Sequence, residues 1–203
     1  MVVAVAIQAI AWRLVALRRA PFWATVTVTW AIVGVAALAI GDPTCCDDRE
    51  LPVALSVGIA SGLLLYAATR IVVTSASRWP VVARTVEDTY ARSGEASPAV
   101  AWAATLAIVV PGEELFWRGV ATPWLVDATA TAPGAALGWL VAVAVAATWA
   151  SLPFLAAAVF GGAVWTALAI WSGGVAAPIA SHLVWTACMI AWPPLPPRAK
   201  VAG

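Results

Sequence analysis

Charged residues are scarce in this sequence. Only 10% of its 203 residues are Asp, Glu, Lys or Arg, whereas 63% are hydrophobic and the mean hydropathy is +0.93. Soluble domains carry roughly 25% charged residues, so this chain has too little polar surface to cover a soluble fold of its length. Its net charge of +1 gives no electrostatic basis for binding nucleic acid. The composition therefore predicts an integral membrane protein.

Histidine and cysteine are also scarce. The chain has one histidine, His182, and three cysteines, Cys45, Cys46 and Cys188. No Cys-x-x-Cys pair or Cys/His spacing typical of a metal site occurs in the sequence. Zinc sites usually take three or four His, Cys or carboxylate ligands. We therefore expect neither a metal ion nor a cofactor.

Long apolar runs make up most of the chain. A run of about 20 apolar residues is long enough to cross a bilayer as a helix, and lipid does not tolerate irregular backbone. A weaker candidate, Met1–Leu17, is interrupted by Gln8 and Arg13. The runs predict an all-α, polytopic transmembrane helix bundle with six or seven spans. The clear spans are Phe22–Ile40, Leu51–Val73, Pro98–Val120, Pro133–Ser151, Phe154–Trp171 and Val175–Trp192.

The segment Arg78–Gly94 is more polar than its neighbours and has the pattern of an interfacial amphipathic helix. Pro80 suits the start of that helix and Gly94 its end. The chain then divides into three parts. We expect N-terminal transmembrane helices and the interfacial helix in residues 1–97, a core in 98–193 and a disordered tail in 194–203.

Basic residues predict the orientation in the membrane, because Lys and Arg gather in cytoplasmic loops. With the predicted spans, nearly all basic residues fall on one side. We therefore expect a multi-pass protein of the cell membrane with its C-terminus in the cytoplasm. The residues on this side are Arg13, Arg18, Arg19, Arg70, Arg78, Arg84, Arg92, Arg198 and Lys200.

Three charges lie together inside an apolar span, in the stretch VVPGEELFWRGV. Pro111 at its start cannot donate a backbone hydrogen bond, so we expect the helix to kink or restart there. The two carboxylates that follow would then lie near a local helix N-terminus, where negative charge is favoured. Glu114 and Arg118 are four residues apart, with the acid first, which is the favourable order for an ion pair.

Glu113 has no such partner within the motif. A carboxylate in an apolar site is disfavoured in its ionised form by desolvation, and proteins use this effect to tune a general base. The alternative is that the three charges only lock helices together, since paired charges within a membrane can be structural. His182, in the last span, can pack near the glutamates, and the residues alone leave a functional and a structural role equally open.

The motifs resemble a known family. The stretch EELFWRG resembles the E-E-x-x-x-R-G motif of the CAAX-protease and bacteriocin-processing (CPBP) membrane proteins, which include the type II CAAX prenyl endopeptidases. The stretch SGGVAAPIASHLVWT resembles the later segment of that family, with a small-residue turn, a proline and H-x-x-x-N. The similarity covers about Pro98 to Trp192.

This resemblance implies an intramembrane endopeptidase that hydrolyses a peptide bond of a membrane-associated peptide or protein. Glu113 would activate water, and His182 would stabilise the oxyanion of the tetrahedral intermediate. Glu114 and Arg118 would hold the geometry of the site. Thr186 stands where the family has asparagine and would be a supporting residue.

The chain departs from the family pattern at a further motif, F-x-x-x-H. Alignment on aromatic residues places Trp149 and Pro153 there, and alignment on the following Leu-Pro places Ser151, so neither register contains a histidine. An alternative function therefore stays open, in which the protein is an inactive pseudo-protease that binds or scaffolds another membrane protein. A small transporter with Glu113 as its proton site is a third candidate.

Overall fold

The computed structural model describes residues 1–43, 47–93 and 96–195. Its described residues form helices and contain no strand, so the predicted all-α fold class is confirmed. Cys45, Cys46 and most of the predicted disordered tail lie outside the described residues. The helices are α1 (Val2–Ala16), α2 (Phe22–Ile40), α3 (Leu51–Ala76), α4 (Pro80–Ser93), α5 (Pro98–Ala104), α6 (Val110–Phe116), α7 (Thr122–Ala128), α8 (Thr131–Ala147), α9 (Leu152–Ser172) and α10 (Ala176–Ala191), with π-helical η1 (Thr105–Val109) and η2 (Trp117–Ala121).

Four helical segments are long and apolar enough to cross a membrane: Phe22–Ile40, Leu51–Ala76, Ala99–Ala128 and Leu152–Ser172. Three further apolar helices, α1, α8 and α10, are shorter, with 15, 17 and 16 residues. At 1.5 Å per residue they measure about 22–26 Å, against a hydrocarbon core of about 30 Å. The protein is a multi-pass membrane protein whose predicted spans comprise both long and short helices.

The segment from α5 to α7 differs from its prediction in two respects. It continues to Ala128, eight residues beyond the predicted end at Val120, and it neither breaks nor restarts at Pro111. Every junction residue from Ala104 to Thr122 has right-handed helical torsion angles. The expected local helix N-terminus in front of the glutamates is therefore wrong.

Two π-helical segments take the place of the expected restart. In η1 the N–H of Val110 bonds to the carbonyl of Thr105, and in η2 the N–H of Thr122 bonds to the carbonyl of Trp117. Each segment comes directly before a proline turn, at Pro111 and Pro123. A proline cannot donate to the carbonyl four residues earlier and its ring crowds that carbonyl. A widened turn accommodates the proline while the helix continues, and such π segments are frequent at functional sites.

Glycines bring the helices of the bundle close together. A Cβ on Gly112 of α6 would lie 2.4 Å from the carbonyl oxygen of Trp30 on α2. On α3, Gly58 and Gly62 face α10, where an added Cβ would lie 2.4 and 2.5 Å from the backbone oxygens of Ala177 and Ser181. Small residues four apart are a common way for membrane helices to approach each other. These contacts fix α6 and α10, the two helices that carry the predicted site.

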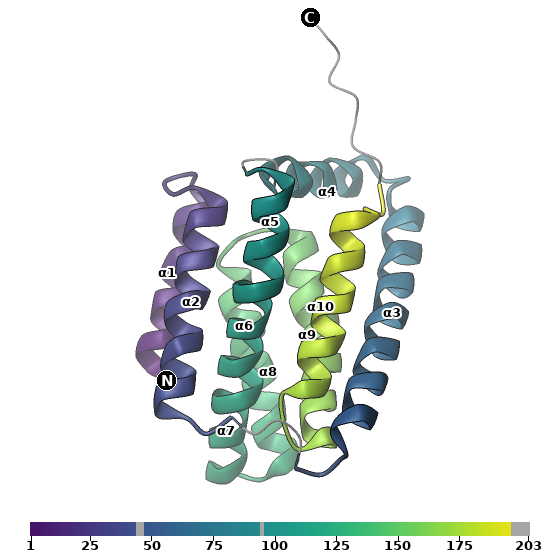
Figure 1. Cartoon of the computed structure of the whole chain (residues 1–203). Helices are drawn as coiled ribbons and strands as arrows, with labels where there is room; N and C mark the ends of the chain where they lie inside the picture. The colour runs from purple at the N-terminus through teal and green to yellow at the C-terminus, as the bar shows by residue number, and fades with distance from the viewer. Residues whose placement is uncertain (44–46, 94–95, 196–203) are drawn as a thin grey trace, which may run out of the picture.

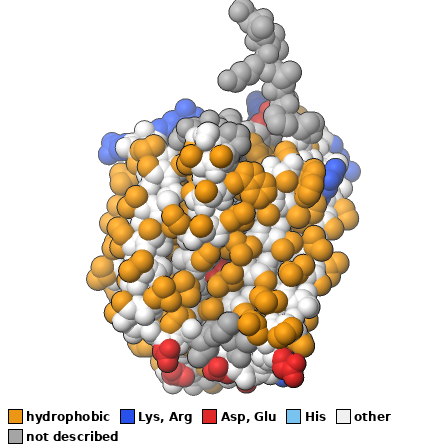
Figure 2. Space-filling view, in the orientation of Figure 1, with side chains coloured by type: hydrophobic (Ala, Val, Ile, Leu, Met, Phe, Trp, Pro, Cys, Tyr) orange, Lys and Arg blue, Asp and Glu red, His pale blue; other side chains and the backbone are white. Residues whose placement is uncertain are grey.

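The helix α4 lies across one end of the bundle, as expected for an interfacial helix (Figure 1). Its Tyr90 hydroxyl donates to the carbonyl of Met189 near the end of α10. Lys and Arg side chains gather at this end and most Asp and Glu side chains at the opposite end, with an apolar band between them (Figure 2). A small acidic spot interrupts that band halfway between the ends. The two ends and the band have the polarity of a protein that spans a bilayer.

Candidate active site

The centre of the site is an ion pair on the long helix. Arg118 Nη1 lies 3.2 Å from Glu114 Oε1, one helical turn apart, as the spacing predicted. The Glu114 side chain is completely buried and that of Arg118 is 2% exposed. Because both charges are removed from solvent, each depends on the other for compensation.

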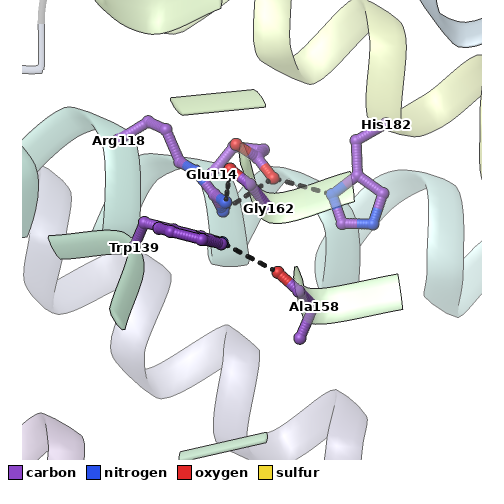
Figure 3. Close-up of polar contacts among 6 residues, drawn as sticks. All are labelled: Glu114, Arg118, Trp139, Ala158, Gly162 and His182. Carbon is purple, nitrogen blue, oxygen red and sulfur yellow. Dashed lines mark hydrogen bonds and ion pairs between the residues drawn. The ribbon is translucent and has the colours of Figure 1, made fainter. Parts of the chain in front are cut away.

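His182 joins this pair from α10. Its Nδ1 lies 2.7 Å from the same Glu114 oxygen. That oxygen therefore contacts both Arg118 and His182 (Figure 3). A carboxylate paired with arginine only accepts hydrogen bonds, so Nδ1 carries the proton and donates it. The ring also stacks on Trp165, with centroids 3.6 Å apart and planes 13° apart. These contacts fix the orientation of the imidazole and leave Nε2 as its available nitrogen.

The helix α9 holds the other side of the guanidinium. Arg118 Nη2 donates to the carbonyl of Gly162 at 3.1 Å (Figure 3). A Cβ on Gly162 would lie 3.4 Å from Nη2 and 3.2 Å from Trp139, so the absence of a side chain permits this approach. The indole of Trp139 donates to the carbonyls of Ala158 and Val159 on the same helix, at 3.3 and 3.0 Å.

Glu113 lies beside this network but outside it. Its side chain is partly buried, and among the described residues it has no hydrogen-bond or ion-pair partner. One ligand atom from each of Glu113, Glu114 and His182 can be chosen so that all lie within 4.8 Å of one another. A single small molecule could therefore contact both the free carboxylate and the imidazole.

A pocket of about 60 Å³ lies in front of these groups. One water molecule needs about 10–15 Å³ of such space, so the pocket can hold more than one. Polar groups and aromatic rings share its wall. It is lined by Gln8, Trp12, Trp30, Glu113, Trp117, Arg118, Ala142, Val145, Ala146, Phe154, Ala157, Ala158, Gly162, Trp165 and His182.

The three ligand atoms could in principle hold a metal ion. Such an ion would share Glu114 with Arg118 and His182, which lie 3.2 and 2.7 Å from Oε1, while Oε2 is buried without a hydrogen-bond partner. It would also place a second positive charge next to the buried guanidinium. The donor set therefore fits an ion poorly, and the absence of a metal site stays a prediction.

Three further sequence candidates do not line the pocket themselves. The Thr186 hydroxyl, one turn after His182, is enclosed and has no hydrogen-bond partner. Ser151 and Trp149 precede α9, where the indole of Trp149 packs against Phe154 with ring centroids 4.2 Å apart. None of Thr186, Ser151 and Trp149 is among the lining residues. The position of the missing histidine is thus next to an aromatic cluster.

Sequence reasoning missed three features of this site. It paired Glu114 with Arg118 but not with His182, 68 residues away. It assigned no role to Gly162 or Trp165, although the glycine pair in FGGAVW was visible in an apolar helix. It treated Gln8 as an interruption of a weak span, whereas that polar residue lines the pocket.

Comparison with known proteins gives one match. The family model described as "Type II CAAX prenyl endopeptidase Rce1-like" matches residues 95–188. This range contains Glu113, Glu114, Arg118 and His182 and agrees with the resemblance drawn from the motifs. No curated protein and no solved structure matches the chain.

Proposed function

We propose that the protein is an intramembrane endopeptidase of the type II CAAX prenyl endopeptidase Rce1-like family, on the premise that residues 95–188 match the model of that family. The observation that carries the proposal is the unpartnered Glu113 carboxylate in a pocket with room for water, beside an imidazole oriented by Glu114. The substrate is a peptide bond of a membrane-associated peptide or protein.

In the proposed reaction Glu113 is the general base. A pocket water gives a proton to Glu113 while its oxygen bonds to the carbonyl carbon of the substrate. The carbonyl electron pair moves onto the oxygen, which becomes the oxyanion of the tetrahedral intermediate. The proton on Glu113 then passes to the amide nitrogen as the carbon–nitrogen bond breaks, so the carboxylate is regenerated.

The other three residues support this step. His182, when Nε2 carries a proton, donates a hydrogen bond to the oxyanion. Glu114 orients the ring through Nδ1, as the third group of a catalytic triad does. Arg118 compensates the charge of Glu114 and ties both to α9 through the carbonyl of Gly162. Thr186 remains a proposed supporting residue.

The pocket wall suggests an apolar substrate group. Five aromatic residues line it, and aromatic rings provide large apolar contact surfaces. The family name refers to prenyl substrates, so a prenylated C-terminal peptide is the first substrate to test. The rings are Trp12, Trp30, Trp117, Phe154 and Trp165.

The test is cleavage by the purified full chain in lipid nanodiscs. Peptides ending in Cys-aliphatic-aliphatic-X, with and without a farnesyl group, are incubated in parallel, together with an unprenylated peptide library read by mass spectrometry. We expect cleavage by the wild type and none by Glu113→Gln, which keeps the size of the side chain but removes its basicity. A folded wild type that cleaves none of these peptides would refute the proposal.

A second candidate function follows from the missing histidine. Ser151 or Pro153 occupies its position, and a pseudo-protease would keep the fold to bind another membrane protein. In that case a stoichiometric partner would co-purify with both the wild type and Glu113→Gln, and neither would cleave peptide. Turnover by a monomeric wild type favours the endopeptidase instead.

We further propose that the end of the bundle that carries α4 faces the cytoplasm. Its support is the excess of Lys and Arg side chains at that end (Figure 2) and the preference of such residues for cytoplasmic loops. The C-terminus would then be cytoplasmic, because α10 ends beside α4.

A further inference from the structure

Gln8 is a polar residue in an unusual place. It lies on α1, in a helix that is otherwise apolar up to Trp12, and its side chain is 0% exposed. Neither its amide nitrogen nor its amide oxygen has a hydrogen-bond partner. Buried polar groups nearly always have a partner, so an amide with neither group satisfied requires an explanation.

The pocket provides that explanation. Gln8 lines it together with Glu113 and His182, although it lies far from both in the sequence. Two further lining residues, Trp30 and Trp165, also have buried indole nitrogens without a partner. An indole N–H only donates, and the amide of Gln8 can donate two hydrogen bonds. A pocket with several free donors suits a molecule rich in acceptors, such as a peptide carbonyl or its oxyanion.

The reaction proposed above needs such a donor. An oxyanion is usually stabilised by more than one hydrogen bond, and His182 is the only histidine of the chain. Glu113 and Glu114 accept hydrogen bonds, the Arg118 Nη atoms serve Glu114 and Gly162, and Arg118 Nε is a buried donor without a partner. Gln8 therefore adds a neutral donor to the pocket without adding a charge that the bilayer interior would disfavour.

We propose that Gln8 is a catalytic residue whose amide nitrogen donates a hydrogen bond to the oxyanion of the tetrahedral intermediate. It would take over the role left open by the missing histidine. The inference rests on the proposed endopeptidase function and adds to it a residue outside the matched segment 95–188. The active site would then be shared between the N-terminal helix and the family domain.

The test compares Gln8→Leu and Gln8→His with the wild type, and Ile7→Val, an exposed neighbour on α1, is the matched control. Leucine keeps the approximate size but removes the donor, whereas histidine returns an N–H to the position. We measure kcat and KM for a cleaved peptide, the affinity for a phosphinate analogue of that peptide and the melting temperature. The phosphinate group mimics the negatively charged tetrahedral intermediate.

For Gln8→Leu we expect kcat to fall roughly 100- to 1,000-fold, as for the loss of an oxyanion donor, with KM nearly unchanged. The affinity for the analogue should fall by a similar factor, the melting temperature should not fall, and Gln8→His should recover part of kcat. If the wild type cleaves and Gln8→Leu cleaves equally well, only this inference fails. It also fails if kcat and melting temperature fall together and Gln8→His restores neither. A wild type that cleaves nothing refutes the proposed function and this inference with it.

Discussion

Replacement of Glu114 by glutamine should destabilise the protein, whereas the same change at Glu113 should not. Glu114 is completely buried and one of its oxygens serves both Arg118 Nη1 and His182 Nδ1. Glutamine still offers an acceptor oxygen, but it removes the negative charge and leaves the guanidinium uncompensated. The partner carbonyl of Gly162 is neutral and cannot replace that charge.

The magnitude follows from this loss of compensation. Removal of one partner of a buried ion pair costs about 3–5 kcal/mol, and the retained acceptor places Glu114→Gln near the lower value. For a chain of 150–250 residues, 1 kcal/mol shifts the melting temperature by about 2–4 °C. We therefore expect a decrease of about 6–12 °C. Glu113→Gln should leave the melting temperature unchanged or raise it, because it removes a partly buried charge that has no partner.

The assay is thermal unfolding in detergent, followed by tryptophan fluorescence. A double-mutant cycle with Arg118→Met separates the ion pair from other effects, since the double variant should lose less stability than the sum of the single variants. A larger loss of stability for Glu113→Gln than for Glu114→Gln would refute the assignment of roles. The charges would then be explained by helix packing, and the endopeptidase proposal would lose its general base.

Three further predictions concern packing, metal and orientation. Gly112→Ala should lower the melting temperature more than Gly162→Ala. The Cβ at position 112 would lie 2.4 Å from the Trp30 backbone oxygen, whereas the Cβ at position 162 would lie 3.2 Å from a side-chain atom of Trp139. Melting curves showing the reverse order would contradict this packing. EDTA should leave peptide cleavage unchanged, since a metal ion bound to Glu114 would place a second positive charge next to the buried Arg118 guanidinium; a loss of activity that zinc restores would contradict this. In a cysteine-free background, a membrane-impermeant maleimide added to intact cells should label Glu50→Cys and not Arg84→Cys, and the opposite pattern would invert the proposed orientation.

The helices could be predicted from the sequence because each depends on local properties. A run such as Phe22–Ile40 is apolar over the length of a span, and its structural bounds are those predicted. The ion pair of Glu114 and Arg118 was equally local, since residues four apart on a helix are neighbours. The end of the long helix could not be predicted in this way. Pro123 and the polar residues around it indicate a helix end, and the helix continues past them only because a widened turn accommodates the proline.

The rest of the site depends on how the helices are rotated about their axes. The bond between His182 and Glu114 requires α10 to present one particular face to α6, and the sequence pattern of an almost uniformly apolar helix does not specify that face. Gln8 is a similar case. Its position in the pocket depends on the docking of α1 against α2 and α8. The close glycine contacts that fix such rotations are visible only in three dimensions.

The two π segments, η1 and η2, determine how the long helix would respond to the loss of a residue. Each widened turn is equivalent to one additional residue accommodated within an α-helix. Deletion of one residue from Thr105–Val109 would return that turn to α-helical bonding with little rotation of α5 relative to α6. The seven residues Val110–Phe116 would keep their place against α2. The direction in which the two carboxylates face is therefore insulated from insertions and deletions in the preceding part of the helix.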